Sequence, residues 1–458
     1  MKEKRPKFLA LFSGAGGFSI GFKEAGFECI GASDIDEDSE KTHHRNWSNV
    51  PFLRKNAATI LTEDILNLIG DEMPDVIIGG PPCQGFSLMG DKHGSDPRNM
   101  LFSSYVNIVR ELKPKCFVFE NVKGLISLKK GAFLKQLSHD FANCGYDIYF
   151  KVLNAADYGA PQNRERVIIF GTKLNSGFMF PEPSNVSVGN IKSYKNVGEA
   201  INDLENNKSN NSNHIVLNHS ERVIERYKLI PEGGRLPPPD ELPENIRRKN
   251  FGSTYIRLDR SKPSMTLVPG NNAFPIHPVL NRSLTPREAA RIQTFPDDHI
   301  FEGNRRKQCI LVGNAVPPIL AANIALEVKN HLNNKKPVIK DTIFQSRFKA
   351  GDKVLKFENI STAKGSNAGH NFIDLFSGAG GISIGLSNAG FNPVIAADFN
   401  ADVAKTHKVN FPNTDYVHGD LSSEETKSKI LGKLKGKKIT LLAGGPPCQG
   451  FSIFGKRR

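Results

Sequence analysis

The chain has 458 residues, of which 38% are hydrophobic and 24% charged, a composition typical of a globular protein with two or three domains. Its formal net charge of +14 favours a polyanionic partner such as nucleic acid, although a basic, solvated surface would give the same total. No apolar run reaches the length of a membrane span, and no signal-type apolar segment follows the first residues, which predicts a cytoplasmic protein with no membrane partner. The six cysteines include no C-x-x-C pair, so we expect reduced thiols and neither disulfides nor a metal site.

The N-terminal segment alternates strand and helix patterns around a glycine-rich turn. Residues 8–12 predict a strand, the turn SGAGG follows, and a helical pattern then runs from Phe18 to Gly26. A second strand at 29–33 ends at Asp34, 20 residues after the first glycine of the turn. This order is typical of Rossmann-like folds, in which the glycines let a nucleotide cofactor approach the backbone and the acid binds the ribose hydroxyls.

Two features follow before the next strand. Residues 37–47 predict a helix that carries His43 and His44. Because adjacent helical side chains point to different faces, we expect surface histidines and not a metal pair. Asp64 then precedes the next strand, where its carboxylate could accept the exocyclic amine of an adenine or cap a helix.

The stretch GGPPCQGFS at 79–87 follows a short apolar strand. Its two prolines make a stiff, extended approach, and its glycines allow a tight turn and a close ligand. The thiol of Cys83 is thereby held on a rigid loop at the carboxyl end of a strand, where open α/β sheets bind ligands. The pattern predicts a catalytic nucleophile, while a buried structural cysteine is the alternative.

Charged residues also follow the later strands. The apolar strand at 116–119 ends in Glu120, whose pKa burial could raise until it holds a proton near neutral pH, which suits hydrogen bonding to a base edge. A helix-capping role is the alternative. Strands are also predicted at 146–153 and 166–170, and between them a polar loop carries Arg164 and Arg166. These arginines could bind an anion or a carbonyl, or be solvated loop charges.

Regular patterns stop between 172 and 281, where basic and aromatic residues are interleaved. We predict a small loop-rich domain with a nucleic-acid surface, with a flexible insertion as the alternative. The residues that suggest this surface are Arg222, Arg226, Arg235, Arg247, Arg248, Lys249, Arg257, Tyr227, Phe251 and Tyr255. Helical patterns return after Thr285, which we expect to be a helix cap, and run again to about Leu332.

After a Lys-, Asn-, Ser- and Gly-rich linker at 334–370, the chain repeats itself. Residues 372–381 restate the first strand and turn, Asp398 restates Asp34, and Asp420 is expected to restate Asp64. Residues 444–452 restate the cysteine loop and place Cys448 opposite Cys83. One repeat at this distance predicts a domain duplication and not a solenoid.

Together, these motifs resemble the DNA (cytosine-5)-methyltransferase family. The series FSGAGG, GGPPCQGFS, ENV, QNRER, LTPREAAR and GNAVPP occurs in family order over residues 7–332. Residues 371–458 resemble the beginning of the same series as a truncated second copy.

The resemblance implies an α/β, Rossmann-like S-adenosylmethionine-dependent methyltransferase fold. The catalytic domain would comprise 1–171 and 282–333, the target-recognition region 172–281, and a partial second Rossmann-like half 371–458. S-adenosylmethionine would be the cofactor. The residues implied to bind it are Phe12, Gly14, Gly16, Asp34, Ile35, Asp64 and Asn314.

The resemblance also implies chemical roles for residues of these motifs. Cys83 would attack carbon 6 of cytosine, Glu120 would contact ring nitrogen 3 and the amine, and Arg164 and Arg166 would hold the base carbonyl. The residues implied to position the base and the loop are Pro82, Gln84, Ser87, Asn121 and Val122. The second-copy equivalents Cys448, Asp398 and Asp420 are expected to be inactive alone.

The implied function is sequence-specific methylation of carbon 5 of cytosine in double-stranded DNA, after the base is flipped out of the duplex. We expect it in the bacterial cytoplasm at the nucleoid, beside a cognate restriction endonuclease. Three alternatives remain open: the same chemistry on tRNA, a non-catalytic DNA-binding relic, and a subunit whose second copy another chain completes.

Overall fold

The computed structural model describes residues 5–82, 99–184, 194–205, 212–247, 255–268, 274–333, 346–348, 370–378, 380–434 and 436–445. The chain divides into two compact units, Met1–Leu355 and Lys356–Arg458. Each unit is built around its own sheet. The division falls inside the segment predicted to be a linker.

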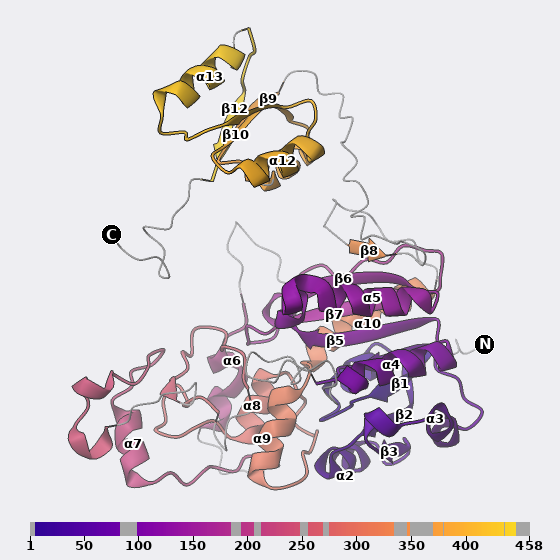
Figure 1. Ribbon diagram of the computed structural model, residues 1–458. Helices are drawn as coiled ribbons and strands as arrows, with labels where there is room; N and C mark the ends of the chain where they lie inside the picture. Colours follow the sequence, from indigo (N-terminus) through magenta and orange to yellow (C-terminus); the bar gives the residue numbers. More distant parts are fainter. Residues whose placement is uncertain are drawn as a thin grey trace. The chain divides into compact units, whose positions relative to one another are not determined.

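The first unit contains an eight-stranded sheet in the order β3-β2-β1-β4-β5-β7-β6-β8 (Figure 1). Its strands are β1 (Lys7–Leu11), β2 (Glu28–Asp34), β3 (Phe52–Arg54), β4 (Val76–Gly79), β5 (Cys116–Val122), β6 (Asp147–Asn154), β7 (Glu165–Thr172) and β8 (Ser346–Phe348). The strands β1 to β5 pair in parallel, whereas β7 runs antiparallel to both β5 and β6. This is the Rossmann-like architecture predicted from the sequence. The strand β8 comes from the segment expected to be a linker and pairs with β6.

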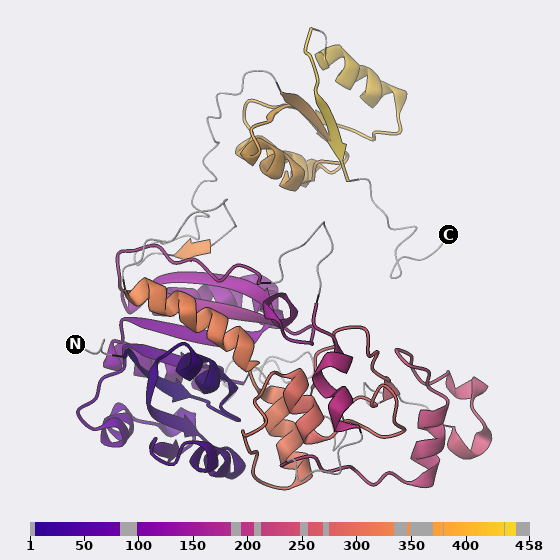
Figure 2. The same cartoon turned by 180° about the vertical axis from the view of Figure 1, so that it is seen from behind.

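Helices cover both faces of this sheet (Figures 1 and 2). One face is covered by α1 (Gly17–Glu24) and α10 (Pro318–Leu332), and the other by α3 (Thr62–Ile69), α4 (Asn99–Leu112) and α5 (Ala132–Asn143). A further helix, α2 (Glu37–Asn46), packs beside β3. Along β1, Phe8 and Ala10 join the core under α1 and α10, whereas Leu9 and Leu11 join the opposite core. Because successive strand side chains alternate, a strand buried on both faces must be apolar throughout.

The close contact of α1 with α10 depends on two glycines. A Cβ on Gly17 would collide with the main-chain oxygen of Val316, and a Cβ on Gly21 would collide with the main chain at Ala322. Glycine inside a helix costs about 1 kcal/mol relative to alanine, so close packing must offset that cost here. The helix that follows the glycine turn is thereby fixed against the last helix of the unit.

A smaller lobe contains α6 (Val197–Ile201), α7 (Glu221–Lys228), α8 (Pro286–Ile292) and α9 (Arg305–Asn314). The helices α6, α8 and α9 share one apolar core, while Tyr227 and Tyr255 lie in a separate core beside α7. By contrast, Phe178 and Phe180 pack into the core of the main sheet. The packing therefore does not follow the boundaries predicted at 171 and 281. Residues 178–180 pack with the main sheet, and α8 and α9, which lie beyond 281, pack with the lobe.

The start of α8 shows the predicted cap. The Thr285 hydroxyl accepts the main-chain N–H of Glu288 at 3.1 Å, and the Glu288 carboxylate accepts the N–H of Thr285 at 2.8 Å. Pro286 occupies the first helical position, where its missing N–H is not needed. These reciprocal bonds form a capping box.

Within the described ranges, the one stretch apolar enough to cross a membrane runs from Arg305 to Leu332, with a mean hydropathy of 1.8. It consists of α9 and α10, and 67% of its apolar window is buried inside the protein. This stretch therefore serves as core.

The second unit has a four-stranded parallel sheet in the order β11-β10-β9-β12, the order in which β3, β2, β1 and β4 stand in the first unit. Its strands are β9 (Asn371–Leu375), β10 (Asn392–Asp398), β11 (Asp415–His418) and β12 (Leu441–Gly444). Its helices are α11 (Gly381–Asn388), α12 (Ala401–Asn410) and α13 (Glu424–Leu434). The expectation of a partial second Rossmann-like half is confirmed.

Candidate active site

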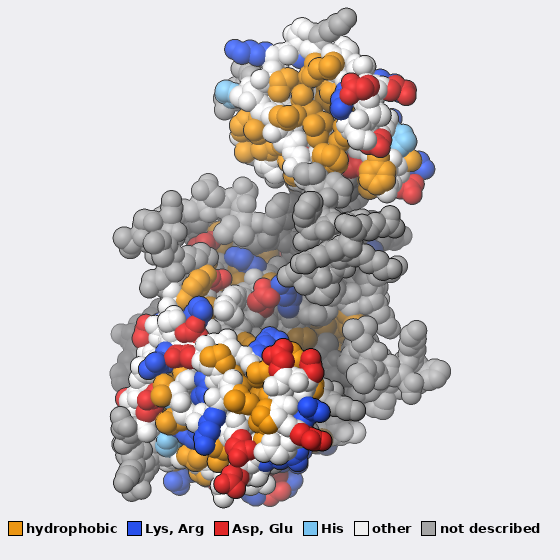
Figure 3. All heavy atoms as spheres, turned by 90° about the vertical axis from the view of Figure 1, so that its left-hand side faces the viewer, with side chains coloured by type: hydrophobic (Ala, Val, Ile, Leu, Met, Phe, Trp, Pro, Cys, Tyr) orange, Lys and Arg blue, Asp and Glu red, His pale blue; other side chains and the backbone are white. Residues whose placement is uncertain are grey.

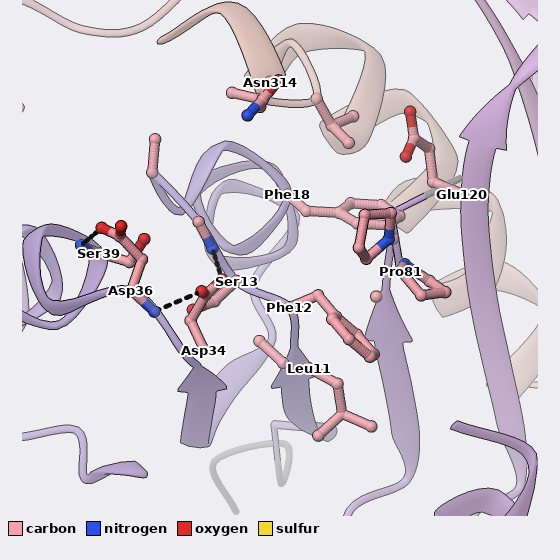
Figure 4. Close-up of a pocket in the computed structure, with 18 of the residues that line it drawn as sticks. Leu11, Phe12, Ser13, Phe18, Asp34, Asp36, Ser39, Pro81, Glu120 and Asn314 are labelled. Atoms are coloured by element: carbon pink, nitrogen blue, oxygen red, sulfur yellow. Dashed lines mark hydrogen bonds between the residues drawn. The ribbon is translucent and has the colours of Figure 1, made fainter. Parts of the chain in front are cut away.

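A cavity of about 860 Å³ opens in the first unit where β1, β2, β4 and β5 end. Figure 4 shows Asp34 and Asp36 at one side of it, Pro81 and Glu120 at the other, and Asn314 opposite Phe12. A cavity of this size lies in the range found for small-molecule sites, at the carboxyl ends of parallel strands.

The glycine turn forms the floor of the cavity between these two sides. Phe12 and Gly14 line it and have positive φ angles of 53° and 52°. Gly16 has a φ of 82°, but it is not among the described lining residues, because its α-carbon faces the ring of Trp47, which a Cβ would strike. Gly16 therefore packs against the only tryptophan of the chain, which leaves no room for a side chain at this position.

Asp34 fixes the turn and remains able to bind a ligand. Its Oδ2 accepts the N–H of Gly14 at 2.8 Å, and its Oδ1 accepts the N–H of Asp36 at 3.0 Å. Burial raises the pKa of Asp34, and these main-chain donors partly offset that effect. Two carboxylate oxygens have about four acceptor positions, so the main-chain donors do not use them all and the carboxylate can still accept a ligand hydroxyl. Ile35 follows with its side chain 62% exposed at the cavity, where an apolar ring could lie against it.

Asp64 does not reach the cavity. Its Oδ2 accepts the N–H of Leu61 at 2.8 Å and bonds Lys55 Nζ at 2.6 Å, so it serves the start of α3. The hydrogen bond from Lys55 is the main reason that the pKa of Asp64 is lowered. The capping alternative is therefore the one that the structure shows.

The sheet registers identify which residue takes the position that Asp64 was expected to hold. In the first unit, Asp34 lies opposite Arg54 across β2 and β3. In the second unit, Asp398 lies opposite His418 across β10 and β11. Equivalent residues can therefore be counted forward from Arg54 and His418.

Two residues further on stand Asn56 and Asp420. The side-chain Oδ1 of each accepts a hydrogen bond from the main-chain N–H two residues later, at 3.0 Å for Asn56 and 2.8 Å for Asp420. Asp420 thus corresponds to Asn56, and its predicted correspondence with Asp64 is wrong. Asn56 lines the cavity, at the start of a 3₁₀ turn over Ala57–Thr59. The sequence repeat could have identified Asn56. Asn56 is found when the two copies are aligned by their strands, whereas aligning Asp420 with the nearest acidic residue leads to Asp64.

The loop that carries the predicted nucleophile begins at the opposite side of the cavity. Cys83, Gln84 and Ser87 lie outside the described residues, whereas Pro81 and Pro82 line the cavity. Asn121 Nδ2 donates to the main-chain oxygen of Pro81 at 2.8 Å. This hydrogen bond holds the chain two residues before Cys83, which supports the predicted role of Asn121 in positioning the loop.

Glu120 and Arg166 form a buried pair beside this loop. Arg166 Nε lies 2.9 Å from Glu120 Oε1, and each side chain is 11% exposed. Burial raises the pKa of Glu120, an effect that the charges of Arg166 and Arg164 oppose. A Cβ on Gly80 would lie 2.7 Å from Glu120 Oε2, so the glycine leaves room for this carboxyl group. A carboxyl group and a guanidinium side by side can contact neighbouring polar atoms of one flat heterocycle.

Arg164 has a different role from Arg166. Its guanidinium donates to the main-chain oxygens of Leu267, at 3.1 Å, and Gly313, at 2.9 Å, and its side chain is buried. Burial, with the nearby charge of Arg166, lowers the pKa of Arg164 to about 9, so it stays charged at neutral pH. Arg164 therefore joins the segment before α8 to the end of α9.

Lys307 is a cavity residue that the sequence did not suggest. It lies on α9, and its Nζ is 2.7 Å from Asp36 and 3.6 Å from Asp38. The pair joins α9 to the start of α2 at the Asp34 side of the cavity. Nothing in the local sequence indicates this, because the partners are separated by 271 residues.

Several residues expected on the nucleic-acid surface of the lobe are core residues. Arg226 donates to Ile246 O at 2.6 Å, and Arg257 donates to the main-chain oxygens of Ile230 and Tyr227 at 2.7 and 2.6 Å. Both guanidiniums are buried. Arg222, Arg235 and Arg247 are exposed, while Arg248, Lys249 and Phe251 lie outside the described residues. Basic and acidic side chains are interspersed over this end of the unit (Figure 3).

The histidine pair and the remaining predicted residues are placed as follows. His43 is buried against Trp47 and Phe52, so the expectation of two surface histidines is wrong for it, whereas His44 is exposed. Val122 and Asn314 line the cavity. Cys448 lies outside the described residues. Within the described ranges, no cluster of three or more His, Cys, Asp or Glu side chains could hold a metal ion.

Known proteins with similar sequences are DNA methyltransferases. The chain matches the family C-5 cytosine-specific DNA methylase over residues 6–330 and 370–458. The Type II methyltransferase M1.HphI of Haemophilus parahaemolyticus is 39% identical over 326 residues, which cover 69% of this chain and 85% of that protein. The Type II methyltransferase M.NgoFVII of Neisseria gonorrhoeae is 37% identical over 329 residues, which cover 69% and 84%.

A solved structure gives the same result. A putative DNA modification methyltransferase encoded within a prophage of E. coli matches with a TM-score of 0.55 and 30% identity, over 72% of this chain and 100% of that one. The fold, the cavity beside the glycine turn and the family match agree. The chain belongs to the C-5 cytosine-specific DNA methylase family and is a DNA (cytosine-5) methyltransferase with S-adenosylmethionine as its methyl donor.

Proposed function

We propose that the first unit methylates carbon 5 of cytosine at a specific sequence in double-stranded DNA, through a flipped-out base and a covalent adduct with Cys83. The observation that carries this proposal is the buried pair of Glu120 and Arg166 beside the Asn121-held loop, on the same cavity as the Asp34 turn. The residues proposed to bind the base and those proposed to bind the cofactor thus line the same cavity.

The residues at the Asp34 side fit S-adenosylmethionine. The Asp34 carboxylate could accept ribose hydroxyls, the exposed Ile35 offers an apolar face, and Asn56 lines the same cavity with a polar side chain. Gly14 has open space around its α-carbon, which lets a ligand approach the turn. When bound, S-adenosylmethionine supplies an electrophilic methyl group on a sulfonium.

The chemistry proposed for the protein begins with the Cys83 thiolate, which forms a bond to carbon 6 of cytosine. The ring double bond's electron pair moves toward carbon 5 and the ring nitrogen. The protonated form of Glu120, which burial favours by raising its pKa, would donate to ring nitrogen 3, and Arg166 would hold the base carbonyl. Carbon 5 would then take the methyl group, with S-adenosylhomocysteine as the leaving group, and ring nitrogen 3 would return its proton to Glu120. A solvent base would remove the carbon 5 proton, and the electron pair of that bond would re-form the ring double bond as the carbon–sulfur bond breaks and returns the Cys83 thiolate.

A cytosine inside a duplex cannot reach Glu120, because the pair is buried at the bottom of the cavity. The base must therefore leave the stack, which costs a few kcal/mol. The net charge of +14 supports binding to the phosphate backbone that this requires.

Restriction-modification is the setting we propose, in the bacterial cytoplasm at the nucleoid and beside a cognate endonuclease. The Type II methyltransferases among the relatives support it. Methylation of tRNA and a partner chain that completes the second copy are the competing functions. Both make the first unit alone insufficient for transfer to DNA.

The test is transfer of a labelled methyl group from S-adenosylmethionine to mixed-sequence duplex DNA and, separately, to tRNA. Cys83→Ser should lower transfer to DNA at least about a thousandfold, since it removes the nucleophile. Cys448→Ser is the matched control from the second copy of the same loop, and we expect wild-type activity. Activity of Cys83→Ser would contradict the adduct, and transfer to tRNA alone would contradict the DNA substrate.

A further inference from the structure

Two asparagines hold one short segment of the first unit, residues 299–302, which we call the strap. Asn46 lies at the end of α2, and Asn213 lies in the predicted target-recognition region 172–281. Neither is among the described residues that line the cavity. We propose that both are positioning residues for S-adenosylmethionine, because they hold the strap against the glycine turn. The place of the donor at this turn rests on the proposed function, whereas the connections from the asparagines to the turn are contacts within the protein itself.

Each asparagine bonds both main-chain groups of one strap residue. Asn46 Nδ2 donates to Ile300 O at 2.8 Å, and its Oδ1 accepts the N–H of Ile300 at 2.9 Å. Asn213 Nδ2 donates to Phe301 O at 2.7 Å, and its Oδ1 accepts the N–H of Phe301 at 2.9 Å. Because an amide side chain offers a donor and an acceptor side by side, each pair of bonds fixes the orientation of the strap as well as its position. Consecutive strap residues are thus held by α2 and by the lobe.

The outer residues of the strap are bonded to the same two elements. The N–H of Glu302 donates to Thr42 Oγ1, on α2, at 3.0 Å. The guanidinium of Arg287, on α8 of the lobe, donates to His299 O at 2.7 Å. All four residues of the strap therefore have a hydrogen bond to α2 or to the lobe, and the strap joins these two parts of the unit.

The strap reaches the glycine turn through the ring of His299. This side chain is 4% exposed and interacts with the main chain of Ala15. Its ring centroid lies 5.6 Å from that of Trp47, whose own ring occupies the space beside Gly16. Burial lowers the pKa of His299 to about 3, so an uncharged ring packs here at neutral pH. The turn therefore rests against two rings, one of which belongs to the strap.

The backbone of Asn213 supports a specific role for its side chain. Its φ is 68°, in the left-handed region that residues other than glycine rarely adopt, although asparagine tolerates it better than most. Such a conformation persists where the surrounding structure enforces it. Glycine could adopt the same φ without strain but would lack the amide that bonds Phe301.

The second unit repeats the end of α2 without a strap. The motif KTHHRNW, which ends at Trp47, recurs as KTHKVNF at 405–411. Asn46 is half-buried, whereas its counterpart Asn410 is exposed. Among the residues described for the second unit, none corresponds to the strap. Since the motif is the same and the burial differs, the strap and not the helix gives Asn46 its role.

The experiment is isothermal titration calorimetry of the full chain with S-adenosylhomocysteine, together with steady-state kinetics in S-adenosylmethionine. Asn213→Gly removes one amide without adding backbone strain, and Asn46→Ala removes the other. Each substitution removes two hydrogen bonds from the strap, so it should weaken binding and raise the KM for S-adenosylmethionine about five- to tenfold. The kcat should stay unchanged, because neither asparagine lies at the base-binding side of the cavity.

The emission of Trp47 gives a second measurement that needs no ligand. Trp47 is the only tryptophan of the chain, and its ring lies beside that of His299. In both strap variants its emission should shift to longer wavelength, since water reaches a ring that the strap no longer covers.

Two control variants separate positioning from stability. Asn410→Ala changes the matched asparagine of the repeated motif and should alter neither the KM nor the emission of Trp47. Asn196→Ala removes the cap of α6, where Asn196 Oδ1 accepts the N–H of Glu199 at 2.9 Å. It should destabilise the lobe and leave both measurements unchanged.

The outcomes distinguish this proposal from the proposed function. Unchanged affinity and emission in the two strap variants would overturn the role of the strap and leave the proposed function in place. A fall in kcat at unchanged KM, or an equal loss of affinity in Asn196→Ala, would also overturn it. A wild-type chain that does not bind S-adenosylhomocysteine would contradict the donor site of the proposed function itself.

Discussion

The two glycine turns of this protein have the same backbone conformation, but different residues pack beneath them. Under the first turn lies Ala10, an apolar residue of the sheet core. Its equivalent in the second unit is Asp374, whose Oδ2 accepts the hydroxyl of Ser383 at 2.7 Å, and that hydroxyl lies 3.1 Å from His407 Nε2. The φ angles of the turns nevertheless agree closely. The comparison teaches that the glycines and the carboxylate at the end of the second strand set the turn, while the layer beneath it can change from apolar to polar.

The largest difference that we expect between the units concerns Glu120, which has no counterpart in the described part of the second unit. Glu120→Gln should lower kcat for methyl transfer about 10²–10³-fold, because a group that stabilises charge on the base is lost. The wild-type rate should fall as the pH rises through the raised pKa of Glu120, since only the protonated form donates to ring nitrogen 3.

The pH–rate profile of Glu120→Gln should lack that descending limb. Glu165→Gln is the matched control, because Glu165 is exposed on β7 and pairs with Lys123 at 2.9 Å. An unchanged profile in Glu120→Gln would assign the titration to another group.

The second prediction concerns the packing against α1 and α11, the helices that follow the glycine turns. Gly21→Ala should destabilise the first unit by about 2–4 kcal/mol, because the new methyl group strikes the main chain of α10. Gly385→Ala should instead stabilise the second unit by about 0.5–1 kcal/mol, since nothing lies within 4 Å and alanine is the better helix former. Chemical denaturation followed by hydrogen exchange in each sheet measures both. Equal destabilisation by the two substitutions would mean that α11 is covered as α1 is.

A smaller effect concerns the polar support of the second turn. Burial raises the pKa of Asp374, so the folded state holds this proton more tightly than the unfolded chain does. The contribution of Asp374 to stability is therefore largest below its ordinary pKa of 3.8 and is lost as the pH rises through the raised value.

Asp374→Ala places the residue of the first unit in the second. The free energy of unfolding of the wild type minus that of this variant should increase as the pH falls from neutral into that window. Hydrogen exchange at β9 measures this free energy in the second unit alone. A difference that does not change with pH would contradict the raised pKa of Asp374.

The smallest effect belongs to Lys307. Its partner Asp36 corresponds to Asn400 in the second unit, which carries no charge, so among the described residues this ion pair belongs to the first unit alone. Lys307→Met should raise the KM for S-adenosylmethionine about two- to fivefold at low salt, with kcat unchanged, because half-exposed ion pairs contribute at most about 1 kcal/mol. The effect should shrink as salt is added. A fall in kcat would place Lys307 in the chemistry instead.

Much of the fold and part of the site could be predicted from the sequence, because the relevant information is local. The glycine turn, the strand ending at Asp34 and the capping box at Thr285 are each set by residues close in sequence. Glu120 was predictable because a carboxyl group ending an apolar strand needs a partner, although the sequence did not single out Arg166 over Arg164 as that partner.

The wrong predictions have a common physical cause. The sequence gives the type of a polar side chain but not the direction in which it points. Arg226 and Arg257 were expected to bind nucleic acid, yet they donate to main-chain oxygens inside the lobe. Asp64 was expected at the cavity, yet it caps α3, and the ion pair of Lys307 depends on two segments that only the fold brings together.

Arg164 has a consequence for how this protein can change over generations. It donates to the main-chain oxygen of Leu267, in the segment before α8. The neighbouring Gln162 accepts the main-chain N–H of Leu267 at 2.9 Å. Asn163 and Ser264 likewise meet through main-chain atoms. Main-chain oxygens are common to all amino acids and main-chain N–H groups to all but proline, so substitutions other than proline in this segment leave the attachment intact. The side chains of this segment can therefore change while its attachment to the start of β7 stays the same.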